Sequence, residues 1–285
     1  MNILITGANG QLGSEIKRIH KNYSQHRFFF TDVDELDITN YQQVKASLAN
    51  QKIDTLINCA AYTAVDKAEE EEAKASLING KAPGILAEAA KETGAKLIHV
   101  STDYVFNGKT YTPYKESDKP NPEAAYGKTK LEGEKAIAES NANAFIVRTA
   151  WLYSEYGKNF VKTMLRLGAE KEEIGVIFDQ VGSPTYALDL AEAVLKLAGT
   201  KAKGTTVYHY SNEGVCSWYD LAVEIMNYKG YQCRVKALET HEYPTPASRP
   251  PYSVLNKTKI KDDLSLKVPH WRTSLVKCLD NLEKT

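Results

Sequence analysis

The sequence predicts an α/β fold whose core is a doubly wound parallel sheet with helices on both faces. Over residues 1–150, short β-type runs alternate with longer helical runs, and this alternation is typical of parallel strands joined by crossover helices. The chain has 285 residues, of which 42% are hydrophobic and 25% charged. That length and composition suit one large α/β unit or two packed parts.

Strands are expected where short runs are rich in β-branched and other apolar residues. In chain order these runs are 2–6, 27–31, 54–58, 96–101 and 144–150. Helical patterns separate them at 12–22, 44–49 and 125–140, and a long Ala, Glu and Lys segment fills 66–93. Within that segment, the four carboxylates at 69–72 are interpreted as a solvated helix face.

The later chain is less regular. Helices are expected at 160–167, 188–197 and 219–228, and strands at 175–178 and 206–210. Aromatic and proline residues cluster at 243–252, which indicates a loop that forms a lid or a pocket wall.

Charge and composition argue against several classes of function. Lys plus Arg and Asp plus Glu number 36 each, so no net charge favours a nucleic acid or an anionic membrane as partner. No apolar run approaches the roughly eighteen residues of a membrane span, and the chain enters a strand at Asn2, so a cytoplasmic location is expected. The four cysteines and six histidines show no ligand spacing, and no metal site is predicted.

A glycine-rich turn directly follows the first expected strand. It has the spacing G-x-x-G-x-x-G, formed by Gly7, Gly10 and Gly13. Glycines let the backbone approach a pyrophosphate, and the N-terminus of the next helix offers it free N–H groups. The position after strand one favours a Rossmann-type dinucleotide site over an ordinary strand-to-helix turn.

The ends of the second and third strands supply further candidates. Asp32 could bond the ribose of an adenosine and would repel a 2′-phosphate, which favours NAD, although Asp34 or Asp37 could take that place. Ala60 and Ala61 would let a cofactor lie against the backbone, and a close-packed strand end is an equal alternative.

Tyr126 and Lys130 lie four residues apart in an expected helix, so the phenol and the ammonium project from one face. One charge about 4 Å away, at an effective dielectric of about 20, supplies roughly the 4 kcal/mol that brings a tyrosine pKa near 7. The pair could then exchange a proton at neutral pH, beside Ser101 and Thr102 at a strand end. A solvated helix pair is the alternative.

In this order, the glycine turn, Ser101-Thr102 and the Tyr126/Lys130 pair resemble the extended short-chain dehydrogenase/reductase superfamily. Within that superfamily, essentially the whole chain is similar to the dTDP-4-dehydrorhamnose reductase family. The segments that carry this similarity are 64–69, 101–108, 159–165, 179–185 and 243–250.

The resemblance implies a Rossmann cofactor domain at 1–150, completed by parts of about 180–212. A smaller α/β substrate domain at 151–179 and 213–285 would be interleaved with it. The implied catalytic residues are Tyr126, Lys130 and Thr102. Those implied to touch NADH or NADPH are Gly10, Gln11, Leu12, Asp32, Asp37, Ile38, Ala60, Ala61, Tyr62, Tyr126 and Lys130. The sugar nucleotide would contact Thr102, Asp103 and Trp151.

The activity implied by the resemblance is NAD(P)H-dependent reduction of the C4 ketone of a dTDP-linked deoxysugar, giving dTDP-L-rhamnose for polysaccharide synthesis. Tyr126 would donate the proton, Lys130 would lower the pKa of the phenol, and Thr102 would bond the ketone oxygen. Similar dehydratases carry an Asp-Glu pair where this chain has Asp103-Tyr104, so reduction is favoured. Another sugar-nucleotide enzyme of this superfamily, or a non-catalytic NAD(P)-binding subunit, remains an alternative.

Two further expectations concern metal and substrate. Some members of the family are metal-linked dimers with an acidic ligand on the first helix, where this chain has Glu15, and Asp189 would be a second ligand. No third ligand is identified, so a homodimer and Mg²⁺ are only implications of the resemblance. Arg249 is expected to bind the pyrophosphate of the sugar nucleotide, with anchoring of the C-terminal loops as the alternative.

Overall fold

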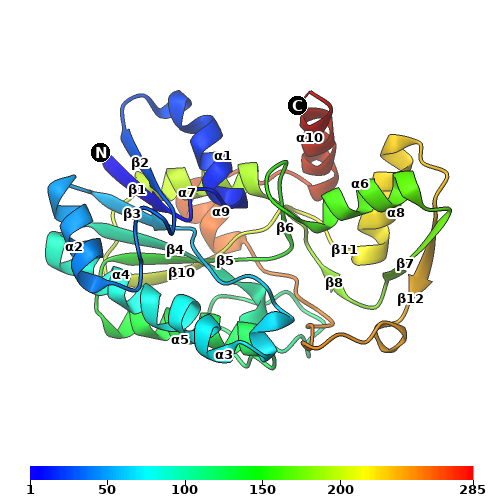
Figure 1. The fold of residues 1–285 in the computed structure, drawn as a ribbon, viewed down its shortest axis with the longest axis horizontal. Helices are drawn as coiled ribbons and strands as arrows, with labels where there is room; N and C mark the ends of the chain where they lie inside the picture. Colours follow the sequence, from blue (N-terminus) through cyan, green and yellow to red (C-terminus); the bar gives the residue numbers. More distant parts are fainter. Residues whose placement is uncertain (285) are drawn as a thin grey trace.

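A six-stranded parallel sheet forms the centre of the computed structural model, which describes residues 1–284 (Figure 1). The strand order is β10-β5-β4-β3-β1-β2, and every neighbouring pair runs parallel. The strands are β1 Asn2–Thr6, β2 Arg27–Thr31, β3 Thr55–Asn58, β4 Lys96–Thr102, β5 Ala144–Thr149 and β10 Thr205–His209. The predicted doubly wound parallel sheet is therefore confirmed.

Helices cover both faces of this sheet because its strands are apolar on both sides. Ile3 and Ile5 of β1 pack into one buried cluster, whereas Leu4 packs into the other. One face carries α1 Gln11–Ile19 and α7 Ala187–Ala198. The opposite face carries α2 Tyr41–Asn50, α4 Ala82–Thr93 and α5 Ala125–Glu139, seen below the sheet in Figure 1.

A second, smaller part lies at the right of Figure 1 and is built mainly from later residues. Its parallel strands β7 Glu173–Ile177 and β12 Arg234–Leu238 pack against α8 Trp218–Lys229, which contacts α6 Phe160–Glu170. The chain builds β7 before it returns to the sheet at β10. The interleaving of two domains and the division at residue 150 both stay predictions.

Short elements link the two parts. Two-residue strands pair β6 with β9 and β8 with β11. They are β6 Leu152–Tyr153, β8 Val181–Gly182, β9 Thr185–Tyr186 and β11 Cys216–Ser217. The chain ends with α9 Thr258–Leu264 and α10 Trp271–Glu283. Neither the four short strands nor α9 and α10 were predicted from the sequence. β12 was not predicted either, because its residues are mostly exposed and lack a buried pattern.

The expected helical segment 66–93 is broken in the structure. It contains a 3₁₀ turn at Lys67–Glu69, the one-turn helix α3 Glu72–Ala75 and a π-helical turn at Ser76–Lys81 before α4 begins. Pro83 has no N–H to donate, so the regular α-helical ladder cannot pass through this point. The side chain of Asn79 also ties the π turn to both backbone groups of Tyr62.

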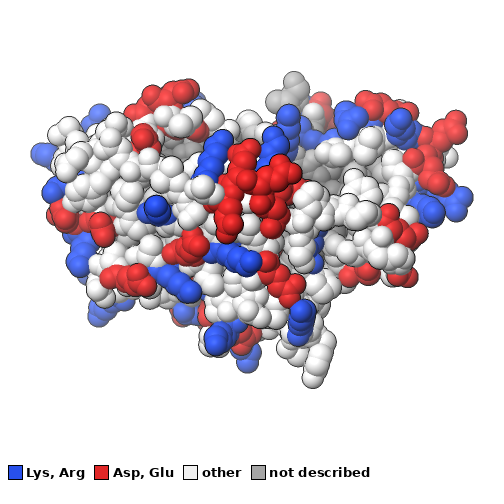
Figure 2. All heavy atoms as spheres, turned by 60° about the horizontal axis from the view of Figure 1, so that its bottom comes forward, with Lys and Arg blue, Asp and Glu red and all other residues white. Residues whose placement is uncertain are grey.

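The surface carries both signs of charge. Figure 2 shows acidic side chains gathered near the middle of one face, with basic side chains around them. The four carboxylates at 69–72 are all exposed, in agreement with a solvated surface, although they do not form one helix face. Within residues 1–284, no helix is both long and apolar enough to cross a membrane.

Candidate active site

The candidate site lies where β1, β3 and β4 end, because the carboxyl ends of parallel strands meet at one edge of a sheet. Gly7 follows β1 in a left-handed conformation with φ of 65°, which favours glycine. A Cβ on Gly7 would lie 2.6 Å from the backbone nitrogen of Ala60, just after β3. The glycine turn therefore packs directly on the end of β3, and a larger residue would push them apart.

Helix α1 begins directly after this glycine turn. Gly10 is its N-cap and provides no side-chain acceptor, so the helix N-terminus keeps the anion-binding character expected of it. Leu12 and Gly13 are buried beneath the turn. Gln11 accepts a hydrogen bond of 3.0 Å from Asn159, the N-cap of α6, which joins the turn to the second part. These features fit the pyrophosphate of a dinucleotide.

The acidic candidates after β2 are already engaged with the backbone. The two carboxylate oxygens of Asp32 accept 2.8 Å hydrogen bonds from the N–H groups of Asn9 and Val33. Asp37 accepts from both the N–H and the hydroxyl of Thr39, and these bonds lower the pKa of Asp37. Asp32 therefore ties the glycine turn to β2, and its contact with a ribose stays a prediction.

Tyr62 and Tyr126 come together around a small cluster of buried alanines. Ala61 and Tyr62 lie in the loop after β3, and the hydroxyl of Tyr62 donates a 3.0 Å bond to Glu71. Ile38 lies further away, partly buried against the face of the sheet that carries α2. Most of the expected cofactor residues thus border one edge of the sheet.

The three expected catalytic residues meet at the end of β4. Tyr126, in the first turn of α5, lies beside Thr102, whose side chain acts to lower the pKa of the phenol. Thr102 in turn donates a 3.0 Å bond to Asp103. The ring of Tyr104 stands edge-on to that of Tyr126, with 5.4 Å between centroids. The phenol is thereby held in one orientation beside two other oxygen-bearing side chains.

The electrostatics of the Tyr126/Lys130 pair differ from the sequence-based expectation. Burial raises the pKa of Tyr126 to about 12; Thr102 opposes this shift and Asp103 adds to it. The Nζ of Lys130 donates a 2.7 Å bond to the carbonyl of Val100 on β4. The expectation of a phenol pKa near 7 is therefore wrong for this structure, and Tyr126 is a protonated phenol at neutral pH.

Sequence analysis missed two residues that contact this group. His99 lies 3.2 Å from the Nζ of Lys130, and Asn58 lies 2.9 Å from the other ring nitrogen of His99. Both are fully buried. A histidine inside the otherwise apolar run 96–101 was the available signal, since a buried polar side chain requires a partner.

The expected substrate residues Asp103 and Trp151 border the second part. Asp103 is buried, and burial raises its pKa to about 6, although Ser253 and Thr102 lower it. Its Oδ2 has no hydrogen-bond partner among residues 1–284. Trp151 stacks on Trp218 with 3.6 Å between ring centroids, at the start of α8.

Arg249 lies in the loop 243–252 but points to a carboxylate of the protein. It makes a two-pronged ion pair with Asp66, at 3.0 and 2.8 Å. It also donates to the hydroxyl of Thr245 and to the carbonyl of Ala247. This geometry corresponds to the alternative role as a loop anchor, because its bonds fold the loop onto the segment after β3. Contact with a pyrophosphate stays a prediction.

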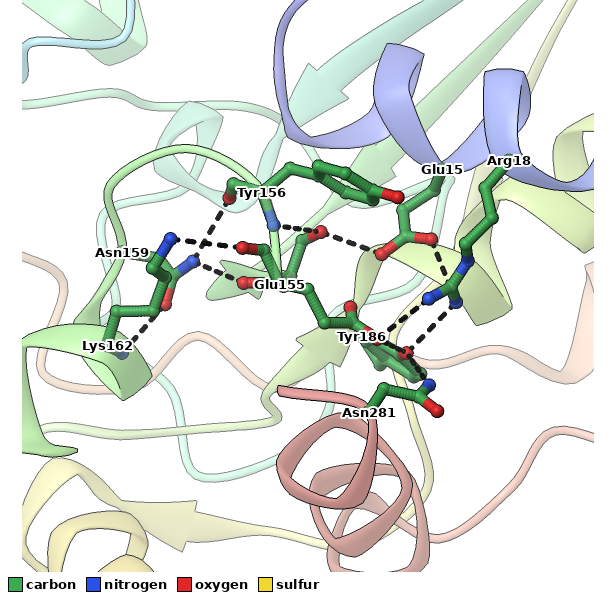
Figure 3. Close-up of polar contacts among 9 residues, drawn as sticks. Glu15, Arg18, Glu155, Tyr156, Asn159, Lys162, Tyr186 and Asn281 are labelled. Atoms are coloured by element: carbon green, nitrogen blue, oxygen red, sulfur yellow. Dashed lines mark hydrogen bonds and ion pairs between the residues drawn. The ribbon is translucent and has the colours of Figure 1, made fainter. Parts of the chain in front are cut away.

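The two acidic residues considered as metal ligands lie in separate networks. Glu15 accepts a 2.7 Å bond from Ser154 and lies 3.0 Å from Arg18, which also donates to Glu155 (Figure 3). Asp189, in α7, is instead bonded to Asn212. Among residues 1–284, no three His, Cys, Asp or Glu side chains gather as a metal site requires. A Mg²⁺ ion shared between two protomers stays a prediction.

A parallel sheet with a glycine turn after β1, and a threonine at the end of β4 facing a Tyr-x-x-x-Lys pair, defines the class of short-chain dehydrogenases/reductases. The chain belongs to the RmlD substrate binding domain family, whose model matches residues 1–284.

Relatives with known names agree with this family. The dTDP-4-dehydrorhamnose reductase of Escherichia coli K12 is 40% identical over 296 residues, covering 100% of this chain and 99% of the relative. The crystal structure of a dTDP-4-dehydrorhamnose reductase from Clostridium acetobutylicum is 45% identical with a TM-score of 0.93, covering 99% of this chain and 100% of that one. A Bacillus anthracis dTDP-4-dehydrorhamnose reductase in complex with NADP is 41% identical with a TM-score of 0.94, covering 98% and 99%.

Proposed function

We propose that this protein reduces the C4 ketone of dTDP-4-dehydrorhamnose with NADH or NADPH, and so makes dTDP-L-rhamnose, a precursor of cell-surface polysaccharide. The observation that carries the proposal is the meeting of Tyr126 with Thr102, which acts to lower the pKa of the phenol, close to Lys130 and at the sheet edge that carries the glycine turn. Membership of the family supports it, since relatives across the full chain are named for this reaction.

When bound, the nicotinamide cofactor supplies a hydride. The glycine turn and the N-terminus of α1 would hold its pyrophosphate, with donors on the backbone. Thr102 gives its one hydroxyl hydrogen to Asp103, so a ketone oxygen placed against both side chains receives its hydrogen bond from the phenol of Tyr126. This donor stabilises the negative charge that develops on the oxygen.

Tyr126 is the proton donor in this mechanism. Because burial raises the pKa of Tyr126 to about 12, the phenol carries its proton throughout the neutral range. An alkoxide is more basic than a phenolate, so the proton moves from Tyr126 to the sugar oxygen as that oxygen gains charge. The ammonium of Lys130, one turn further along α5, stabilises the phenolate that remains.

The residue after Asp103 favours reduction over dehydration. Dehydratases that resemble this scaffold use a second acid there, whereas Tyr104 has no carboxylate and packs edge-on against Tyr126. A non-catalytic subunit would have no need to keep Tyr126 beside Thr102 together with a buried Lys130. Both alternatives are therefore weaker than a reductase.

The remaining expectations for this protein follow from the same proposal. We place it in the cytoplasm, where the cell makes both nucleotide sugars and reduced cofactors. A homodimer is implied by the resemblance and is tested by light scattering of the purified chain.

The proposal is tested by following the oxidation of NADH and NADPH, in separate assays, with a panel of 4-keto sugar nucleotides. We expect the fastest turnover with dTDP-4-dehydrorhamnose, and a strong loss of turnover when the keto sugar lacks its dTDP group. Binding of cofactor without oxidation of it by any keto sugar would instead support the non-catalytic subunit.

A further inference from the structure

Four buried polar side chains form a continuous chain behind the candidate site. The hydroxyl of Thr6 donates to Asn58 at 2.7 Å, Asn58 lies 2.9 Å from His99 Nδ1, and His99 Nε2 lies 3.2 Å from Lys130 Nζ. They come from β1, β3, β4 and α5, and each is at most 1% exposed. Because bulk solvent does not reach these side chains, the neighbouring protein groups decide the direction of each hydrogen bond between them.

The backbone N–H of Ala60 fixes the orientation of the Asn58 amide. An N–H can only donate, and it lies 3.1 Å from one end of the amide, so that end is the oxygen Oδ1. The other end, which faces His99, is therefore the amide nitrogen, which also only donates. His99 Nδ1 must then accept this bond, and the ring proton of neutral His99 lies on Nε2.

This tautomer directs an N–H at Lys130. An ammonium has only N–H groups to offer, so two donors would oppose each other across 3.2 Å. A neutral amine has a lone pair that accepts the bond from Nε2–H. It still has a hydrogen for the 2.7 Å bond to the carbonyl of Val100. Both contacts of Nζ are therefore satisfied only when Lys130 is an amine.

The other charged group near Lys130 is already paired. Glu134, one turn along α5, favours the ammonium, but its carboxylate binds Arg148 at 2.7 Å and Ser101 at 2.6 Å. Tyr126, on the preceding turn, is uncharged in the neutral range. From β4, the titratable side chain that faces Lys130 is His99.

We propose that His99 is a positioning residue that presents its Nε2–H to Lys130 and thereby favours the amine over the ammonium at this site. Burial acts in the same direction and lowers the pKa of Lys130 to about 8. The inference rests on the proposed function for its kinetic consequence. If the ammonium stabilises the phenolate, kcat/KM falls as pH rises through about 8, where Lys130 loses its proton.

The first test reads the tautomer directly by NMR of protein labelled with ¹⁵N in histidine. We expect the His99 ring to carry its proton on Nε2 and to show no titration between about pH 5 and 9. His209 is the other fully buried histidine and is bonded to Tyr114. The variant His209→Gln removes its NMR signals, which identifies those of His99, and it is also the matched control. A proton on Nδ1 would overturn the proposal, because Nε2 would then accept from a charged Lys130. This readout does not depend on enzymatic activity.

The second test reverses the direction of the hydrogen bonds that link Asn58, His99 and Lys130. In Asn58→Asp the carboxylate still accepts from Ala60 and Thr6 but cannot donate, so His99 must move its proton to Nδ1 and accept from Lys130. We expect the NMR tautomer to switch and the alkaline limb of kcat/KM to move up by at least one pH unit, while His209→Gln leaves it in place. If the tautomer switches in Asn58→Asp but the alkaline limb of kcat/KM stays near pH 8, the role of His99 is contradicted. If Asn58→Asp does not fold, His99→Gln provides the same limb measurement with an amide in place of the ring.

Discussion

At the scale of single residues, the chemistry depends on which protons the site holds at neutral pH. Tyr126 keeps its proton because burial disfavours the phenolate, and Asp103 titrates near 6 for the same reason. Lys130 loses its proton more readily than an ordinary lysine. The site thus combines a proton donor, a hydrogen-bond acceptor and a weakly basic amine within one turn of α5 and the end of β4.

Replacing Tyr126 with Phe tests the proton donor. We expect kcat to fall by at least about a hundredfold, the usual loss for a positioned acid, with nearly unchanged cofactor affinity. Steady-state kinetics and a cofactor titration by fluorescence measure the two effects. The matched control is Tyr104→Phe, which keeps the ring packed against Tyr126 and should retain most of the turnover. Near wild-type kcat in Tyr126→Phe would remove this residue from its role.

Replacing Asp103 with Asn tests the acidic side of the pH profile. The ionised carboxylate accepts the bond from Thr102, and protonation through about pH 6 weakens that acceptor. We therefore expect kcat/KM of the wild type to fall below pH 6, and this limb to disappear in Asp103→Asn. The exposed Asp262→Asn in α9 is the control and should keep the limb. An unchanged limb in Asp103→Asn would assign it to another group.

The sequence predicted the members of this catalytic group but not their protonation. Spacing alone places Tyr126 and Lys130 on one helix face. A pKa depends on burial and on where a flexible side chain makes its bonds, and Lys130 bonds to β4. The roles of His99 and Asn58 depend on three strands meeting at one edge, which no local pattern states.

At the scale of elements, α1 connects the glycine turn to the second part of the molecule. The side chains of Gln11, Glu15 and Arg18 all bond to the segment 154–159, and Figure 3 shows the bonds of Glu15 and Arg18. Glu15 lies in this joint beside Glu155, and the two carboxyl groups cannot both be charged without repulsion. Burial, followed by the interaction with Glu155, raises the pKa of Glu15 to about 8.

Replacing Glu15 with Gln tests this joint. The folded protein holds a proton on Glu15 that the unfolded chain releases above about pH 4.5, so stability is lost as pH rises from there to about 8. Gln is neutral at every pH. The Tm of Glu15→Gln should therefore rise relative to the Tm of the wild type as pH rises from 5 to 8. The exposed Glu170→Gln on α6 should show no such trend. A difference in Tm that does not change with pH would mean that Glu15 is ionised.

Sequence patterns predicted the strands of the sheet better than the other elements. Buried strands are continuous apolar runs, and β1 to β5 begin and end within about one residue of their expected bounds. The segment 66–93 looked helical by composition, but Pro83 and the bonds of Asn79 break it. The two-residue strands depend on pairing between distant segments and have no local signal.

At the scale of the whole molecule, the loop 243–252 connects the second part to the sheet. Arg249 and Asp66 are 183 residues apart in sequence, and their ion pair closes this connection. Arg249 is 24% and Asp66 is 42% exposed, so water screens part of the attraction. The role of Arg249 as an anchor was considered from the sequence, but no local pattern identifies Asp66 as its partner.

A double-mutant cycle with Arg249→Ala and Asp66→Ala separates the two roles of Arg249. Anchoring predicts a coupling of about 1 kcal/mol in the free energy of unfolding, measured with urea. Binding to a pyrophosphate instead predicts a large rise in the KM for the sugar nucleotide with an unchanged Tm. A coupling near zero would show that the ion pair does not hold the loop.

The most direct test of the central claim is transfer of deuterium from the C4 position of NADH or NADPH. The cofactor is deuterated on each face in turn and incubated with the wild-type protein and dTDP-4-dehydrorhamnose, and the sugar product is analysed by mass spectrometry and NMR. The account predicts one deuterium at C4 of dTDP-L-rhamnose from one of the two labelled faces. A product without deuterium from either face, or a sugar that has lost water, would contradict it.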